Sequence, residues 1–311
     1  MSEEFLWVEK YRPKTISDTI LPDNLKQTFE TFVGQDNIPN LMLSGGPGIG
    51  KTTVAKAMLE QLGCDYIVVN GSMNGNIDTL RTEIKDFAST ISFVGKRKYV
   101  ILDEADYLNP QSTQPALRNF MEEFSKNCGF ILTCNFRNRV IEPLQSRCSV
   151  IDFKIDKKDR AAMAGQFFNR VCTILDGEQV EYDKKAVAEV ITKYFPDFRR
   201  VLNELQRYSA VGKIDVGVLA NYDVSIDDLI AMLKGKKFDE MRKWVGNNSD
   251  VDTATLFRKL YDTANKHLKP AGVAQLIVTL ADYQYKAAFV ADHEINTVAC
   301  LTEVMMDGDW L

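Results

Sequence analysis

Short apolar runs alternate with amphipathic stretches over the first half of the chain. Five runs rich in Leu, Ile, Val and Phe have the length of buried strands: residues 40–44, 66–70, 99–102, 129–135 and 150–153. The stretches around them have the apolar spacing of helices: residues 24–34, 53–62, 77–91 and 110–126. Strands that alternate with helices predict an α/β fold, with a parallel sheet and helices on both of its faces.

The strand pattern ends near Asp156, and only helical spacing follows. Three helices are predicted in the next part of the chain: residues 156–175, 183–194 and 197–210. A polar break near Asn221 separates them from further helices in the last third. Because 311 residues exceed one ordinary domain, two or three domains are expected. The change of pattern divides the chain into an α/β core at 1–155 and two all-α domains at 156–221 and 222–311.

Composition excludes several classes of protein. The chain is 45% hydrophobic and 26% charged, as in an ordinary globular protein. Its six cysteines form no C-x-x-C pair and it has only two histidines, so a zinc site or a disulfide framework is not expected. No apolar run is long enough to cross a bilayer and the first residues are acidic, so we expect a cytoplasmic protein without membrane contact. The net charge of −5 means that any nucleic acid must bind a local basic patch.

One segment carries a phosphate-binding pattern. It fits G-x-x-x-x-G-K-[ST] with the residues Gly45, Gly46, Pro47, Gly48, Ile49, Gly50, Lys51 and Thr52. A predicted strand precedes it and a predicted helix follows, so backbone N–H groups and the helix dipole would face the phosphates. We expect Lys51 to reach the β- and γ-phosphates of a nucleotide and the Thr52 hydroxyl to hold Mg²⁺.

Polar side chains follow two later strands. Asp103 and Glu104 end the apolar run 99–102, where ligands of parallel sheets bind. Asp103 can orient Mg²⁺ through its water shell, and Glu104 can polarise the attacking water as a general base. Asn135 ends the run 129–135 and could touch the γ-phosphate or simply cap the strand. Near the N-terminus, the segment 7–13 is expected to be extended because of Pro13, and it could cover the adenine or only pin the terminus.

Six separated motifs together resemble one family. They are WVEKYRP (7–13), GGPGIGKTT (45–53), VILDEAD (100–106), LTCN (132–135), QSRC (145–148) and PDFRRVLNEL (196–205). The chain resembles the AAA+ ATPases of the sliding-clamp-loader group, such as replication factor C. It looks closest to the large subunits of clamp loaders from T-even-type bacteriophages. The E-K-Y-R-P and S-R-C motifs are more specific than the two nucleotide motifs, which many ATPases share.

The resemblance implies a division of labour between domains. The three domains would be an ATPase core, a helical lid and a helical collar that joins subunits into a ring. Four copies would assemble with one different small subunit, open a ring-shaped sliding clamp and place it on primer–template DNA. ATP binding would drive opening, and DNA-triggered hydrolysis would release the closed clamp.

The same resemblance implies roles for individual residues. Arg147 would be an arginine finger that reaches the γ-phosphate bound by the neighbouring subunit; the alternative is a surface salt bridge. Arg199 would be a second sensor of the γ-phosphate, although Arg200 lies beside it, and Asn135 would be the first sensor. Arg12 would lie near the adenine, and Thr53 would complete the nucleotide-binding loop.

Other candidates concern coupling and DNA. Arg118 would point across the subunit interface, and Gln114 on the same helix would couple the DNA and ATP sites; both could instead be solvated helix residues. Asn76 occupies the position of a residue that restrains the catalytic glutamate, although the chain differs from phage relatives there. Arg81 and Lys85 are the candidate DNA contacts.

Two other functions compete with clamp loading. A subunit that binds nucleotide without hydrolysing it is disfavoured by the presence of Lys51, Thr52, Asp103, Glu104 and Arg147. A helicase loader or branch-migration motor would be supported by a basic recognition helix near the C-terminus. The last third shows acidic helices instead.

Overall fold

The computed structural model describes eight stretches of the chain. They are residues 5–72, 77–92, 95–210, 212–215, 226–248, 253–264, 266–287 and 289–311. The chain divides into two compact units, Met1–Val218 and Leu219–Leu311.

Five parallel strands form the sheet of the first unit, in the order β2-β3-β4-β1-β5. Their bounds are Leu41–Ser44 (β1), Tyr66–Asn70 (β2), Lys98–Asp103 (β3), Cys128–Cys134 (β4) and Ser149–Asp152 (β5). In the ladder, Ser44 lies beside Cys134, and Asn70 lies beside Asp103. The carboxyl ends of the strands therefore share one edge, as the alternation of strands and helices predicted.

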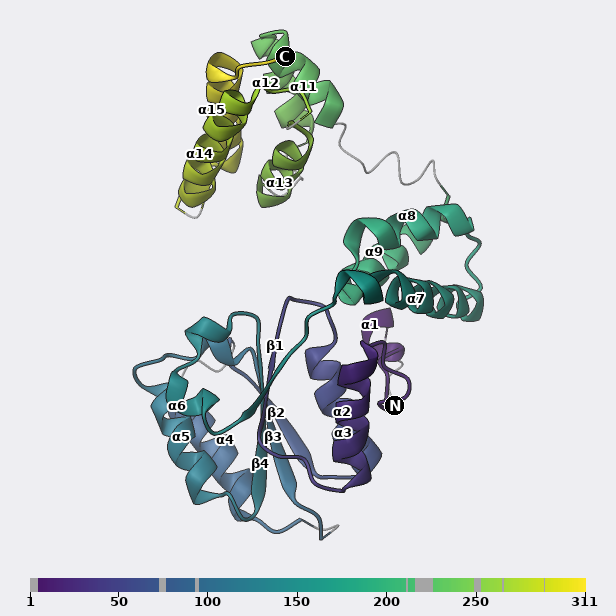
Figure 1. Cartoon of the computed structure of the whole chain (residues 1–311), viewed down its shortest axis with the longest axis vertical. Helices are drawn as coiled ribbons and strands as arrows, with labels where there is room; N and C mark the ends of the chain where they lie inside the picture. Colours follow the sequence, from purple (N-terminus) through teal and green to yellow (C-terminus); the bar gives the residue numbers. More distant parts are fainter. Residues whose placement is uncertain are drawn as a thin grey trace. The chain divides into compact units, whose positions relative to one another are not determined.

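Helices cover both faces of this sheet (Figure 1). On one face lie α2 (Asp23–Gly34) and α3 (Lys51–Leu62), and on the other lie α4 (Ile77–Ser89), α5 (Thr113–Glu123) and α6 (Glu142–Gln145). Successive strand residues point to opposite faces. Leu41 and Leu43 of β1 pack with α3, whereas Met42 between them packs with α5. The predicted fold class is confirmed.

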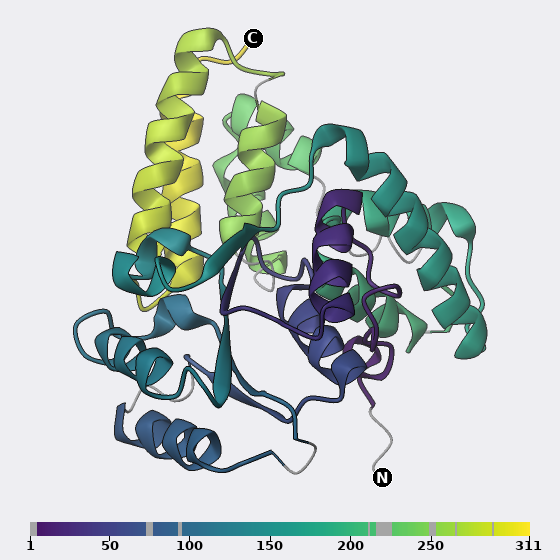
Figure 2. The same cartoon turned by 60° about the horizontal axis from the view of Figure 1, so that its bottom comes forward.

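The N-terminal segment differs from its prediction. Residues Trp7–Lys10 form one helical turn, α1, instead of an extended segment. Pro13 restricts only the residue before it, so it leaves this turn unaffected. The segment contacts a later helix: the Trp7 N–H donates to Gln206 Oε1 at 3.0 Å, and Gln206 Nε2 donates to the Phe5 carbonyl at 2.8 Å. Figure 2 shows the N-terminal segment running beside the teal helices of residues 157–209.

Three helices follow the sheet within the first unit: α7 (Lys157–Gly177), α8 (Lys184–Tyr194) and α9 (Phe198–Ser209). Asp183 and Asp197 cap α8 and α9 by accepting a backbone N–H from the first turn of each helix. Each of the three helices buries apolar side chains, among them Phe167, Val190 and Leu205.

The described part of the second unit contains five helices: α11 (Ile226–Lys234), α12 (Phe238–Asn247), α13 (Thr253–Ala264), α14 (Pro270–Ala287) and α15 (His293–Asp307). They share one apolar core, which includes Leu229, Leu260 and Leu301. Among the described residues of the whole chain, no helix is both long and apolar enough to cross a membrane.

Candidate active site

A pocket opens at the carboxyl edge of the sheet. The phosphate-loop residues 47–54 form its floor, and Asp103, Glu104 and Asn135 line one side. Helices α7 and α9 close the other side with Phe167, Phe198 and Arg199, among others. The pocket thus brings together residues that are far apart in the sequence, from Val8 to Leu202.

The phosphate loop connects β1 to α3. Gly48 and Gly50 have φ angles of +68° and +95°, which favour glycine. Lys51 is the first residue of α3 and is only 7% exposed. Its Nζ donates to the carbonyls of Gly45 and Gly46 at 2.8 and 2.7 Å and to Asn135 Oδ1 at 2.8 Å. Burial lowers the pKa of the Lys51 ammonium, so an additional anion beside it would be stabilising.

Two threonine hydroxyls meet the Asp103 carboxylate. Thr52 Oγ1 and Thr133 Oγ1 each donate to Asp103 Oδ1 at 2.6 Å. The described residues contain no group of three or more His, Cys, Asp or Glu that could hold a metal ion alone. A hydroxyl beside a carboxylate nevertheless supplies the hard oxygen ligands that fit Mg²⁺ when phosphate oxygens and water complete its shell.

Glu104 follows Asp103 in a left-handed backbone conformation, with φ of +56°. Its N–H donates to Thr133 Oγ1 at 3.1 Å, so one hydroxyl serves both acidic positions. Left-handed backbone is unfavourable for a residue with a side chain, and such strain is concentrated at functional sites. Glu104 lines the pocket beside the phosphate loop.

Asp106 holds Asn135 in place, a role that the motif analysis did not assign. The Asp106 Oδ2 atom accepts the N–H groups of Asn135 and Phe136 at 3.2 and 3.0 Å. Asp106 is buried, and its Oδ1 atom has no hydrogen-bond partner among the described residues. Asp106 is the last residue of the VILDEAD motif, so the motif includes it. Its contact with Asn135 could not be predicted, because the folded sheet brings the two residues together.

Apolar side chains also line the pocket. They include Val8, Ile20, Leu21, Phe167, Ile174, Phe198 and Leu202. Arg12 also lines the pocket, where it pairs with Glu9 and donates from Nη1 to Thr53 Oγ1 at 3.3 Å. Arg170 of α7, which sequence reasoning missed, donates to the backbone carbonyl of Asp18 at 2.6 Å and to that of Tyr11 at 3.4 Å. Such an apolar surface suits a flat ring such as a nucleobase.

Arg199 and Arg200 have different surroundings. Arg199 lines the pocket, whereas the Arg200 guanidinium lies over the Tyr194 ring, 4.6 Å from its centroid. The structure therefore separates two neighbouring arginines that the sequence left ambiguous.

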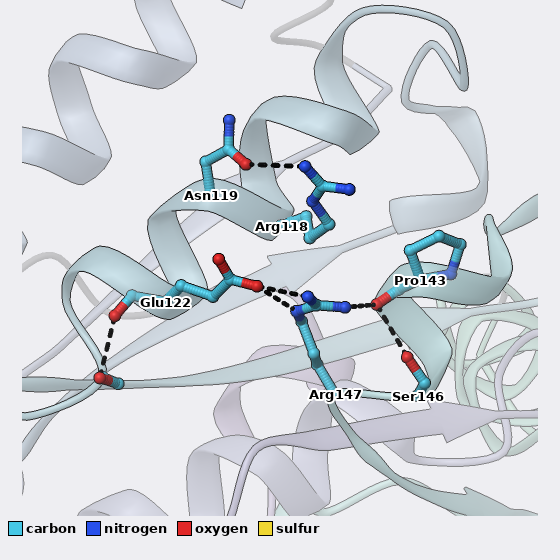
Figure 3. Close-up of polar contacts among 7 residues, drawn as sticks. Arg118, Asn119, Glu122, Pro143, Ser146 and Arg147 are labelled. Atoms are coloured by element: carbon cyan, nitrogen blue, oxygen red, sulfur yellow. Dashed lines mark hydrogen bonds and ion pairs between the residues drawn. The ribbon is translucent and has the colours of Figure 1, made fainter.

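Arg147 lies outside this pocket and is paired within the chain. Its Nε donates to Glu122 Oε1 at 2.9 Å, its Nη2 donates to the same oxygen, and its Nη1 donates to the Pro143 carbonyl at 2.8 Å. Figure 3 shows the Glu122 carboxylate reaching from α5 to this guanidinium, with Arg118 one turn earlier on the helix. The pairing lowers the pKa of Glu122. Both side chains are partly exposed, so a partner could reach this arginine.

Gln114 is fully buried, which excludes the solvated-helix alternative for this residue. Its Nε2 donates to the carbonyls of Leu108 and Arg139 at 2.9 and 3.0 Å, and its Oε1 accepts the Ile141 N–H at 2.8 Å. It therefore links the segment after Glu104 to the segment that leads to α6.

The DNA candidates are only partly described. Lys85 is exposed on α4, and Arg81 lies in the same helix, with its side chain outside the described residues. Asn76 also lies outside the described residues. Two cations lie close to β3: Arg97, just before the strand, donates to the Ser125 and Cys128 carbonyls, and buried Lys98, the first residue of the strand, donates to the Phe87 carbonyl. Both cations therefore bind backbone carbonyls of the core, which indicates a structural role.

Comparisons with known proteins agree with this arrangement. Residues 41–157 match the family of ATPases associated with various cellular activities, and residues 159–220 match the lid domain of the AAA+ sliding-clamp-loader large subunit. The large subunit of the sliding-clamp loader of enterobacteria phage T4 is 34% identical over 99% of this chain and 98% of its own length. The chain belongs to the clamp-loader family of AAA+ ATPases.

A further relative and a solved structure extend the comparison. The replication factor C small subunit of Sulfolobus acidocaldarius is 36% identical over 99% of this chain and 98% of its own length. A RuvB mutant of Thermotoga maritima has a TM-score of 0.53 and 20% identity, covering 68% of this chain and 72% of its own. At that identity, RuvB shares the AAA+ fold alone, so the branch-migration alternative is not favoured. As a clamp-loader AAA+ protein, the chain is an ATPase.

Proposed function

We propose that this chain is the ATPase subunit of a clamp loader, which uses ATP to place a ring-shaped sliding clamp on primer–template DNA during replication. The likeness to a phage clamp-loader large subunit over nearly the full length of both proteins carries this proposal. The phosphate loop, the acidic pair and Asn135 at one edge of the sheet support it. We place the work in the cytoplasm of a host cell, in keeping with the phage relatives.

The pocket is well suited to ATP. The ring would lie among the apolar side chains and Arg12, and the phosphates would lie along residues 45–53. Lys51 would exchange its loop carbonyls for β- and γ-phosphate oxygens. Thr52 and Asp103 would hold Mg²⁺, which when bound supplies positive charge to the developing transition state. Glu104 would accept a proton from the attacking water.

Two residues would sense the γ-phosphate from opposite walls. Asn135, just after β4, already contacts Lys51, and Arg199 lines the pocket from α9. Hydrolysis would remove the γ-phosphate that both residues contact. The position of α9 would therefore depend on whether ATP or ADP is bound.

We propose that Arg147 acts in a neighbouring copy of the chain. It lies outside its own pocket, and a guanidinium supplied to a γ-phosphate by a neighbour raises hydrolysis by ~10³–10⁵. Its pairing with Glu122 would open or shift when that copy docks. Arg118 would face the same interface, and Gln114 would couple it to the segment after Glu104.

The larger assembly follows from the same proposal. Residues 1–155, 156–221 and 222–311 would serve as ATPase core, lid and collar, with four copies joined to one different small subunit. Arg81 and Lys85 would contact DNA phosphates, and Asn76 would restrain Glu104 until DNA arrives.

Steady-state ATP hydrolysis tests this function. The protein would be assayed alone, and then with its small subunit, clamp and primed DNA, with Arg147→Ala as the control variant. We expect little activity from the single chain and strong stimulation that requires primed DNA and Arg147. Full activity of the dilute chain, indifferent to clamp and DNA, would contradict the proposal.

A further inference from the structure

The first turn of α9 contacts the phosphate loop directly. The Phe198 N–H donates to the Gly48 carbonyl at 3.1 Å. Asp197 precedes it as the helix cap, and its Oδ1 accepts the Arg200 N–H at 2.9 Å. A Cβ atom added to Gly48 would lie only 1.7 Å from that same oxygen. The Asp197 carboxylate therefore packs against the glycine itself, in space that no other residue would leave.

Phe198 is fixed on its other side. Its ring lies 4.6 Å from the Phe167 ring and 5.6 Å from the Phe195 ring, centroid to centroid, and both pairs are edge-to-face. Arg160 adds a hydrogen bond to the Phe195 carbonyl at 2.8 Å. The aromatic cluster holds the start of α9 to α7, so the N–H that binds Gly48 has little freedom of its own.

Arg199 comes directly after these two contacts. A cap fixes the backbone of the first helical turn, and a carboxylate there offsets the positive end of the helix dipole. The direction in which Arg199 leaves the helix therefore depends on where Asp197 and Phe198 lie against the loop.

We propose that Asp197 is a positioning residue, which keeps the start of α9 seated on Gly48 so that Arg199 reaches the γ-phosphate. This inference rests on the role proposed above for Arg199. It assigns to Gly48 a second requirement beyond its backbone conformation, namely the space taken by Asp197.

Equilibrium binding of ATP and ADP tests the inference. Fluorescent analogues of both nucleotides would be titrated into Glu104→Gln protein, in which hydrolysis is suppressed, with and without Asp197→Ala. A misplaced Arg199 costs binding only where a γ-phosphate is present. We therefore expect Asp197→Ala to weaken ATP about tenfold relative to ADP. Asp197→Asn retains the acceptor and the shape, so it should preserve most of the preference.

A matched control separates positioning from stability. Asp183 caps α8 with the same chemistry, accepting the Lys185 N–H at 2.9 Å. Asp183→Ala should lower the melting temperature about as much as Asp197→Ala and leave the ATP-to-ADP preference unchanged. An equal loss of preference in both variants would overturn the inference.

Arg199→Ala completes the test. It should lose the preference as well, and the double variant Asp197→Ala, Arg199→Ala should be no worse than Arg199→Ala alone. If Arg199→Ala loses the preference and Asp197→Ala does not, the positioning role is refuted and the proposed function stands. If Arg199→Ala keeps the preference, both the sensor role and the inference fail.

Discussion

Lys51 and Arg147 differ in burial and in the groups that bind their charged ends. Lys51 is buried, and two loop carbonyls and Asn135 satisfy its ammonium group. Arg147 is partly exposed, and a single carboxylate and one carbonyl hold it. An exposed ion pair contributes little to folding and is weakened by salt. Lys51 is therefore suited to a nucleotide site within its own chain. Arg147 is suited to exchange its present contacts for those of a binding partner.

The pairing of Arg147 with Glu122 predicts a shifted titration. Replacing Arg147 with Ala should raise the pKa of Glu122 towards the ordinary range, because the charge-assisted hydrogen bonds that lower it are lost. The pair stabilises the fold above the ordinary pKa of Glu, and this contribution disappears as pH falls through the lowered pKa. Carboxyl chemical shifts followed over pH would measure it. Exposed Glu123 is the internal reference, and an unmoved Glu122 pKa would show that the pair does not persist in solution.

Asp106 predicts a cost in stability. Its removal leaves two N–H groups at the end of β4 without their acceptor. We expect Asp106→Ala to lower the free energy of unfolding by about 1–3 kcal/mol. Chemical denaturation measures this loss. Exposed Asp86→Ala on α4 should change it by less than about 0.5 kcal/mol, and equal effects of the two variants would contradict the structural role.

At the scale of elements, helix α5 carries three of the residues proposed to link neighbouring subunits. Gln114, Arg118 and Glu122 follow one another at four-residue spacing, so they lie along one face of the helix. Its start is buried against the turns that follow β3 and β4, and its end is partly exposed beside Arg147. One helix thus runs from a contact with Leu108, in the segment after Glu104, to the residue proposed to act in the next subunit. That continuity depends on the buried hydrogen bonds of Gln114.

Gln114 therefore predicts a second loss of stability. Gln114→Ala leaves two carbonyls and one N–H without a partner, in a position that is 0% exposed. We expect the free energy of unfolding to fall by about 2–4 kcal/mol. Exposed Gln111, just before the same helix, is the control, and Gln111→Ala should be neutral within about 0.5 kcal/mol. A neutral Gln114→Ala would mean that these bonds are not made.

At the scale of the whole molecule, local sequence patterns were sufficient to predict the strands of the sheet and the motifs at their carboxyl ends. The apolar runs mark the strands because they are buried on both faces, and parallel strands bring their carboxyl ends to one edge. The sequence pattern therefore already associates Asp103, Glu104 and Asn135 with one site. Contacts between distant elements could not be predicted in this way, because nothing near Asp197 in sequence identifies Gly48 as its neighbour. The same holds for Arg170 and the backbone of Asp18. The turn at Trp7–Lys10 was mispredicted because the effect of Pro13 was extended to the whole segment, whereas a proline restricts only the residue before it.

The central claim is that active sites are completed between copies of this chain, and mixing two variants tests it most directly. Arg147→Ala keeps an intact pocket without the donated arginine, and Glu104→Gln keeps the arginine beside an inactive pocket. Each would be assayed for ATP hydrolysis with small subunit, clamp and primed DNA, alone and after mixed assembly. We predict that each variant alone is nearly inactive and that the mixture recovers activity well above their sum. A mixture no better than its components, or Arg147→Ala protein as active as the unaltered chain, would contradict the account.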